Sequence, residues 1–291
     1  MISIGNFNDL RIERFVEHGA YLVEPDENIK PGKTETKFKE VLLPARYVTD
    51  RMVIGDILKV FVYTDSEDRP VATTEIPFAT AGEFAFLQVS QVNRVGAFLD
   101  WGLTKNLLVP FKEQRVKMCP GGIYPVYIYL DKTTNRVVAS AKLEKFLGNV
   151  YPDYTRGQKV DALVLTHTPI GYKVIVNNRH AGMIYENEIY SPLEIGSSIS
   201  AYVKQVRAED GKIDLTLTAP GTLGRIEKIA DKVISLMGEG NFNLNDHSSP
   251  EEIKALLNCS KKDFKKAVGS LYRQNKILIN DNGYLELAST D

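Results

Sequence analysis

The sequence GAFLDWG at Gly96–Gly102 has a counterpart on each side of it, GAYLVEP at Gly19–Pro25 and GYKVIVN at Gly171–Asn177. The first glycines of the three segments are 77 and 75 residues apart. Each segment is followed by a short apolar stretch, a further glycine, an alternating strand and a closing strand, in that order. Because solenoid-type repeats have a period of about 20–50 residues, this longer spacing indicates three copies of one small domain.

Each repeat contains about five short segments rich in Val, Ile, Tyr and Phe, separated by turn residues. Such alternating segments predict β-strands. In the second repeat the strands are expected at residues 84–94, 96–100, 107–110, 123–131 and 136–141. Five short antiparallel strands in one small domain predict the barrel of the OB-fold, which binds oligonucleotides or oligosaccharides on one face.

The apolar period changes from 2 to 3.6 after Gly221. One amphipathic helix is expected to end at Gly238, and two more are expected to begin at Ser249 and Ser260. A short strand at Phe242–Leu244 and a hairpin turning at residues 281–283 complete the pattern, which predicts a winged-helix domain.

The expected fold class is therefore mostly β with a C-terminal α/β part. Three tandem five-stranded OB-fold barrels are expected at residues 1–76, 77–148 and 149–220, and the winged helix at residues 221–291.

The composition is that of a folded globular protein, with 43% hydrophobic and 25% charged residues. No apolar run reaches the roughly 18 residues that a membrane helix needs, and the amino terminus lacks the layout of a signal peptide. Cys119 and Cys259 stand alone, without the spacing of a metal site. We therefore expect a cytoplasmic protein with no metal, no cofactor and no membrane partner.

Charge is distributed unevenly among the predicted domains. Residues 77–148 contain 9 basic and 5 acidic side chains, whereas residues 1–76 contain 10 and 14. Residues 149–220 contain 7 and 8, and residues 221–291 contain 10 and 10. Since a polyanion is attracted to a local excess of basic groups, the second domain is the preferred site for one. The alternative is ordinary scatter between segments of this length.

The second domain also has aromatic side chains suited to single-stranded RNA. Unpaired bases stack on aromatic rings, while basic side chains contact the phosphates. Phe98 is expected to face away from Leu99, a core residue, because neighbouring strand residues point to opposite faces. Trp101, the only tryptophan, follows closely. The basic residues around the two rings are Arg94, Lys105, Arg115, Lys117, Lys132 and Arg136. Alternatively, Phe98 caps the core and Trp101 packs against a neighbouring domain.

The order of these segments resembles the S1-type RNA-binding domain, most closely in the second repeat. The resemblance implies an RNA-binding face with an aromatic residue before the first glycine, another two residues after it, a histidine near the end of strand 3, and an Asp and an Arg at the last hairpin. The second repeat supplies Phe98, Asp131 and Arg136, but has Val95 and Pro110 at the first aromatic and the histidine positions.

The other two repeats depart further from this pattern. The first repeat has Pro44 at the histidine position and matches the family with His18, Tyr21, Asp65 and Arg69. The third repeat has a basic residue at the acidic position, and its candidates are Lys173, Tyr185, Arg207 and Lys212. The resemblance therefore supports the fold of all three repeats more strongly than RNA binding by each of them.

The last predicted helix carries a basic face. Its basic residues are Lys261, Lys262, Lys265, Lys266 and Arg273, against the single acid Asp263. At the position of a recognition helix, they are candidates for contacts with phosphates or a groove. Alternatively, the lysines are merely solvated and the winged helix binds protein.

The sequence contains no convergent set of nucleophile, base and metal ligands and no phosphate-loop, dinucleotide or zinc-hydrolase motif. We therefore expect no enzyme activity.

In whole-chain architecture the sequence resembles the conserved virulence factor B family. The resemblance implies a cytoplasmic protein that binds single-stranded RNA and influences gene expression after transcription. Linked domains with weak individual contacts can reach a useful affinity together. The alternatives are a transcription regulator whose winged helix binds duplex DNA, and a scaffold that docks on the ribosome or another protein.

Overall fold

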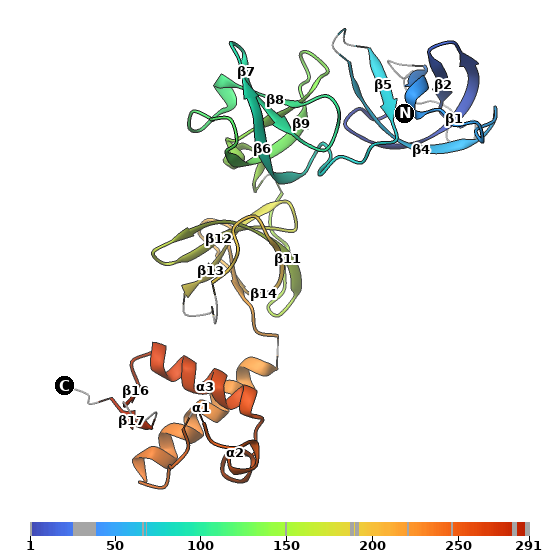
Figure 1. Ribbon diagram of the computed structural model, residues 1–291. Coiled ribbons are helices and arrows are strands. Elements are labelled where there is room, and N and C mark those ends of the chain that lie inside the picture. Colours follow the sequence, from blue (N-terminus) through green and yellow to red (C-terminus); the bar gives the residue numbers. More distant parts are fainter. Residues whose placement is uncertain are drawn as a thin grey trace. The chain divides into compact units, whose positions relative to one another are not determined.

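The computed structural model describes the chain apart from residues 1, 26–38, 66, 68, 149, 187, 188, 190, 191, 220, 246, 281–283 and 289–291, and apart from the side chains of residues 222 and 223. The chain divides into two compact units, Met1–Leu147 and Gly148–Asp291. The described residues form three closed five-stranded barrels, followed by three helices and a two-stranded sheet (Figure 1). The predicted fold class is confirmed.

The first unit contains two barrels. The first barrel consists of β1 (Asn6–Val16), β2 (Gly19–Val23), β3 (Val41–Pro44), β4 (Ile57–Thr64) and β5 (Pro70–Thr73). The second barrel consists of β6 (Phe84–Val92), β7 (Gly96–Asp100), β8 (Leu107–Pro110), β9 (Ile123–Leu130) and β10 (Val137–Ser140). In each, the first strand pairs with both the second and the fourth strand, which closes the barrel.

The third barrel lies in the second unit and repeats this strand order. Its strands are β11 (Lys159–Thr168), β12 (Gly171–Val176), β13 (His180–Tyr185), β14 (Ser198–Val206) and β15 (Ile213–Thr216). The first strand of every barrel has a register shift at the corresponding place, for example between Val89 and Gln91 in β6. Such an irregularity bends a long strand, so that one strand can pair on both sides of a small barrel.

The repeated glycine has a steric cause. A Cβ atom at Gly96 would lie 2.2 Å from the carbonyl oxygen of Val109. At Gly19 and Gly171 the corresponding distances, to the carbonyl oxygens of Leu43 and Ile184, are 2.0 and 2.2 Å. The second strand thus approaches the third so closely that no side chain fits there.

The C-terminal domain contains α1 (Thr222–Gly238), α2 (Pro250–Leu257), α3 (Lys261–Arg273), β16 (Ile277–Ile279) and β17 (Leu285–Leu287). The predicted start of α2 is confirmed, because Ser249 and Glu252 form a reciprocal capping box. The helices pack around a core that includes Val233, Ile253 and Phe264. No helix among the described residues is long and apolar enough to cross a membrane.

The predicted strand at Phe242–Leu244 is wrong. This segment is irregular, and the only β pairing described near it is a single bridge between Asn245 and Tyr284. The predicted turn at residues 281–283 lies outside the described residues. All described strands and helices fall within the four predicted domain ranges, but the exact boundaries stay predictions.

Candidate nucleic-acid interface

A cavity of about 150 Å³ lies on the second barrel, where that barrel meets the first. Four residues predicted to bind RNA line it: Phe98, Trp101, Lys105 and Arg136. The rest of its wall comes from Tyr63, Thr64, Val95, Asn106, Leu107, Leu108, Val137 and Val138. The structure therefore brings together part of the predicted site and adds residues from β4 of the first barrel.

Phe98 owes its place to strand alternation. Its neighbours Ala97 and Leu99 are fully buried in the barrel core, whereas Phe98 is half-buried on the opposite face of β7. Across the sheet it pairs with Gln91 on one side and with Leu108 on the other. Phe98 therefore has the predicted orientation, and it lines the cavity.

Trp101 is buried, with 2% of its surface exposed. Its ring meets Phe61 of the first barrel edge-on, and its indole N–H donates a hydrogen bond to the carbonyl oxygen of Lys105 at 2.6 Å. A ring enclosed in this way offers no free face for a base. Trp101 therefore packs against the neighbouring domain, which is the alternative to stacking on a base.

Lys105 also takes part in the joint between the two barrels. Its Nζ donates a hydrogen bond to the carbonyl oxygen of Thr64 at 2.5 Å. Next to it, the backbone N–H and the hydroxyl of Thr104 donate to the carboxylate of Glu75, at 3.0 and 2.8 Å. Because Nζ of Lys105 already donates to this carbonyl oxygen, the predicted contact of Lys105 with a phosphate would add less binding free energy.

The other basic candidates of the second barrel do not line the cavity. Arg94, Lys117 and Lys132 are exposed. Arg115 is also exposed and forms an ion pair with Glu144 at 2.6 Å. Such exposed cations suit contacts with a flexible phosphate backbone outside the cavity, whereas Arg136 is half-buried at its edge.

The hairpin next to Arg136 is fixed by Asp131. Its carboxylate accepts hydrogen bonds from the backbone N–H of Thr133 and the hydroxyl of Thr134. These bonds hold the pKa of Asp131 below its ordinary value. Asp131 is therefore an ionised, structural residue of the turn that positions Arg136.

The corresponding face of the first barrel is occupied by its own side chains. The guanidinium of Arg14 lies over the ring of Tyr21, 4.1 Å from its centroid. The same guanidinium forms two hydrogen bonds with the carboxylate of Glu40, at 2.6 and 2.9 Å, and the pKa of Glu40 is lowered by this pairing. Tyr21 is half-buried and already has a cation on its ring.

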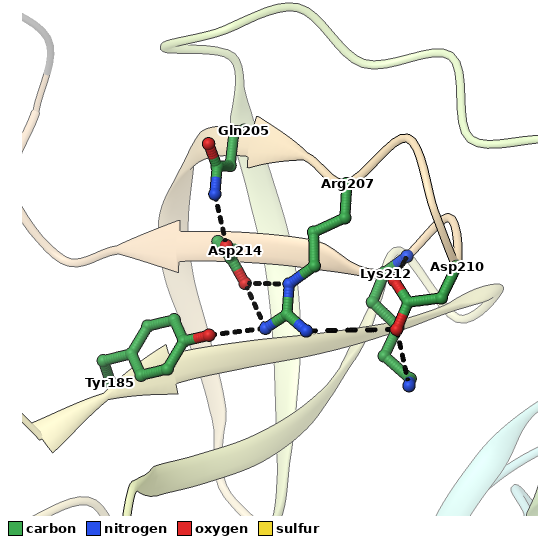
Figure 2. Close-up of polar contacts among 6 residues, drawn as sticks. All are labelled: Tyr185, Gln205, Arg207, Asp210, Lys212 and Asp214. Atoms are coloured by element: carbon green, nitrogen blue, oxygen red, sulfur yellow. Dashed lines mark hydrogen bonds and ion pairs between the residues drawn. The ribbon is translucent and has the colours of Figure 1, made fainter.

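On the third barrel the corresponding face is occupied by a network of ion pairs and hydrogen bonds within the barrel (Figure 2). Arg207 donates two hydrogen bonds to one oxygen of the buried carboxylate of Asp214, at 2.7 and 2.9 Å. It also donates to the hydroxyl of Tyr185 at 2.5 Å, and Gln205 donates to the second oxygen of Asp214 at 2.7 Å. Both Asp214 oxygens are thus satisfied, and the bond with Asp214 raises the pKa of Arg207.

Strand register shows which residues of the third barrel correspond to the charged hairpin of the second barrel. The backbone N–H of Arg207 donates to the carbonyl oxygen of Lys212, as the backbone N–H of Asp131 donates to that of Arg136, so Arg207 stands at the acidic position. Asp214 faces the third strand at the position that Val138 has in the second barrel. The exposed Lys212 pairs with Asp210 at 2.7 Å, and Lys173 is exposed. The third barrel therefore compensates its basic hairpin with its own acids.

In the winged helix the predicted lysines are exposed to different degrees. Lys262 and Lys265 are exposed on α3, whereas Lys261 and Lys266 are half-buried. Arg273 donates a hydrogen bond to the carbonyl oxygen of Ile189 at 2.7 Å. Since this bond is made to a protein backbone, Arg273 is the least suited of the five to contact nucleic acid.

The acid of α3, Asp263, has a structural role at the start of the helix. Asp263 is buried, accepts a hydrogen bond from the hydroxyl of Ser260 at the start of its own helix, and forms an ion pair with Arg225 of α1. Lys262 and Lys265 are the exposed lysines of the basic face of α3.

Sequence reasoning missed Glu113, a buried carboxylate after β8. It accepts hydrogen bonds from the hydroxyl of Ser140 at 2.6 Å and from Nζ of Lys145 at 3.0 Å. It lies in a three-residue 3₁₀ turn, Phe111–Glu113, which is too short to produce a periodic signal. Glu113 joins the end of β10 to the segment that leaves the barrel and so belongs to the scaffold.

Comparisons with known proteins agree with this architecture. Residues 4–75 match the S1 domain family, and residues 231–286 match the CvfB-like winged helix domain. The fold and these matches define the class: a modular protein of S1-type barrels with a C-terminal winged helix, domain types that bind nucleic acid.

Two relatives match most of the chain and so specify the class further. Conserved virulence factor B of Staphylococcus saprophyticus is 26% identical over 247 residues, 82% of each chain. The uncharacterized protein YitL of Bacillus subtilis is 26% identical over 289 residues, 94% of this chain and 90% of its own. The chain is thus a relative of the conserved virulence factor B proteins, as the sequence predicted.

Among solved structures, the chain is similar to a multidomain protein with nucleic acid binding domains from Streptococcus pneumoniae. The two are 25% identical, the match covers 98% of each chain, and the TM-score is 0.39.

Proposed function

We propose that the protein binds unstructured single-stranded RNA, mainly through the second barrel, and acts in the cytoplasm on gene expression after transcription. The proposed activity is binding without catalysis. The observation that carries the proposal is the cavity of about 150 Å³ on the most basic domain, which both Phe98 and Arg136 line.

The chemistry of this cavity favours a single strand over a duplex. A half-buried phenylalanine ring can stack on a base only when that base is unpaired, and stacking contributes about 1–3 kcal/mol per base. Arg136 and the exposed cations outside the cavity supply phosphate contacts. On the other two barrels Arg14 forms an ion pair with Glu40 and Arg207 with Asp214, as Arg115 does with Glu144 on the second barrel.

The winged helix assists in this proposal through Lys262 and Lys265, which are exposed on α3. The same two lysines support the second candidate function, a transcription regulator whose α3 enters duplex DNA. Helix α3 contains no asparagine, glutamine or exposed arginine for reading base edges, and this favours phosphate contacts that are independent of sequence.

Fluorescence anisotropy with the full chain tests the proposal. A U-rich RNA strand and a DNA duplex of equal charge are titrated at about 50 and 200 mM salt. We expect tighter binding of the RNA at both concentrations, with a steep loss of affinity at the higher one because counterions are released on binding. Equal binding of both nucleic acids contradicts the proposal, and tighter binding of the duplex favours the DNA regulator.

A further inference from the structure

We infer that the cavity at the joint of the first two barrels is a composite pocket for one unstacked nucleobase, and that the first barrel supplies part of its wall. The inference rests on the proposed function. It goes further in assigning the ligand of the pocket and a role for the first barrel.

The pocket has contributions from two domains. Tyr63 and Thr64 come from the end of β4 in the first barrel, and the remaining lining residues come from the second. Trp101, which is part of the lining, packs its ring edge-on against Phe61 of the first barrel, and the backbone N–H of Phe78 donates to the carbonyl oxygen of Trp101 at 2.8 Å. An isolated second barrel would still have Phe98, but its pocket would lack the part of the wall that Tyr63 and Thr64 form.

The size of the pocket suits one base. Its volume of about 150 Å³ is half the lower limit of about 300 Å³ for pockets that hold drug-sized ligands. One planar ring system fits such a space, and a base pair does not.

The lining matches the chemistry of a base. Aromatic and aliphatic groups of Phe98, Leu108 and Val138 provide apolar surface for the faces of a ring. Thr64 and Asn106, polar uncharged residues of the lining, carry donors and acceptors suited to its edge. Phe98 offers the stacking partner at the mouth, and Arg136 lies where a phosphate of the same nucleotide can be neutralised.

The first barrel is suited to this supporting role because its own face is closed. Tyr21 is covered by Arg14, which is itself held by Glu40. The end of β4 belongs to a different part of that barrel and points its last residues to the joint, where the carbonyl oxygen of Thr64 is fixed by Lys105. The first barrel therefore acts through the wall that it lends to its neighbour.

The chain provides a matched pair of variants, one at the pocket and one at the corresponding position of the first barrel. Leu108 pairs with Val138 in the second barrel as Leu42 pairs with Val71 in the first, and both leucines are half-buried. Leu108→Phe places extra volume in the pocket, whereas Leu42→Phe adds the same volume at the matching position of the first barrel. Neither variant changes Trp101, so the only tryptophan remains a reporter.

The test uses the full chain and a short U-rich RNA with one 2-aminopurine, together with the same strand lacking that base. We expect shielding of the 2-aminopurine from acrylamide, a shift of Trp101 emission, and about tenfold weaker binding of the strand without the base. Leu108→Phe should abolish the shielding and the difference between the two strands, while Leu42→Phe leaves both unchanged.

A photoreactive 4-thiouridine at the shielded position tests the contribution of the first barrel. We expect crosslinks to the peptide with Tyr63 and Thr64 as well as to the peptide with Phe98. Crosslinks to the second barrel alone overturn the composite wall. If the strand binds but its base stays accessible to acrylamide, the pocket is wrong and the proposed function stands. If the strand does not bind at all, both are wrong.

Discussion

The indole of Trp101 in the second barrel and the ring of Phe61 in the first barrel meet edge-on, with their centroids 5.6 Å apart. Both side chains are buried, and they belong to one continuous core that extends from Phe61 and Val71 into the second barrel. The first two barrels are thus joined by apolar packing as well as by the hydrogen bonds of Thr104 and Lys105. They form one compact unit for this reason.

Replacing Trp101 should therefore destabilise both barrels together. We expect Trp101→Ala to lower the free energy of unfolding by about 3–5 kcal/mol, because a large buried side chain leaves a cavity. The joint should also loosen, so that calorimetry resolves separate transitions of the two barrels. Trp101→Phe, which keeps an aromatic ring at the joint, should lose less. A Trp101→Ala variant that unfolds like the wild type contradicts the structural role of this residue.

Removing the ring of Phe98 should weaken RNA binding with little effect on stability. We expect about tenfold lower affinity of Phe98→Ala for a U-rich strand, since stacking on an aromatic ring contributes about 1–3 kcal/mol per base. Phe98→Tyr should retain most of the affinity. Phe86 is also half-buried on the second barrel but pairs with Pro125, away from the cavity, so Phe86→Ala is the matched control. Equal losses of RNA affinity in Phe98→Ala and Phe86→Ala would contradict stacking of a base on Phe98.

The network of the third barrel should respond to single and double substitutions differently. Asp214→Val leaves Arg207 without its main partner, and we expect a loss of about 2 kcal/mol, below the 3–5 kcal/mol of fully buried pairs because 30% of the Arg207 side chain is exposed. The double variant Arg207→Asp with Asp214→Val installs the two residue types that the second barrel has at Asp131 and Val138. It should recover much of the loss in chemical denaturation, and additive losses would contradict the register argument.

Stability should decrease in acid through Glu113. Burial opposes its ionisation, but hydrogen bonds from Ser140 and Lys145 outweigh burial and hold the pKa of Glu113 below its ordinary value of 4.5. A carboxylate with a lowered pKa in the folded state stabilises the fold above its unfolded pKa, and this contribution is lost as the pH falls through the folded value. Thermal unfolding of the full chain should show this loss below about pH 4.5.

The matched variant for this pH dependence is Glu113→Gln. It removes the titrating group and keeps an acceptor for the hydroxyl of Ser140. We expect it to be less stable than the wild type near pH 7 and to approach the wild type as the pH falls. Parallel pH profiles of the two proteins would refute the assignment to Glu113.

The sequence predicted those features that repeat along the chain or alternate along a strand. The glycine of each repeat was visible because steric contact with the third strand excludes a side chain at Gly19, Gly96 and Gly171 alike. The half-buried position of Phe98 followed from its place beside Leu99 in an alternating strand. Likewise, Ser249 and Glu252 indicated the start of α2 because capping is a local interaction.

Contacts between distant segments had no such signal. The burial of Trp101 depends on Phe61, 40 residues earlier in the chain, and nothing near Trp101 indicates that partner. The cover of Arg14 on Tyr21 and the pairing of Arg207 with Asp214 depend on strand register, which composition does not reveal. The strand predicted at Phe242–Leu244 failed because it lacks an extended partner, with one bridge at Asn245 in its place.

We propose that single-stranded RNA binds at the second barrel and that the winged helix only assists. The most direct measurement compares the affinity of full-length Phe98→Ala and of the double variant Lys262→Glu with Lys265→Glu for the same U-rich strand. We expect the loss in Phe98→Ala to be about tenfold and to exceed that of the double lysine variant at about 200 mM salt, where phosphate contacts are weakened. Full affinity in Phe98→Ala, together with loss of binding in the lysine variant, would contradict the account.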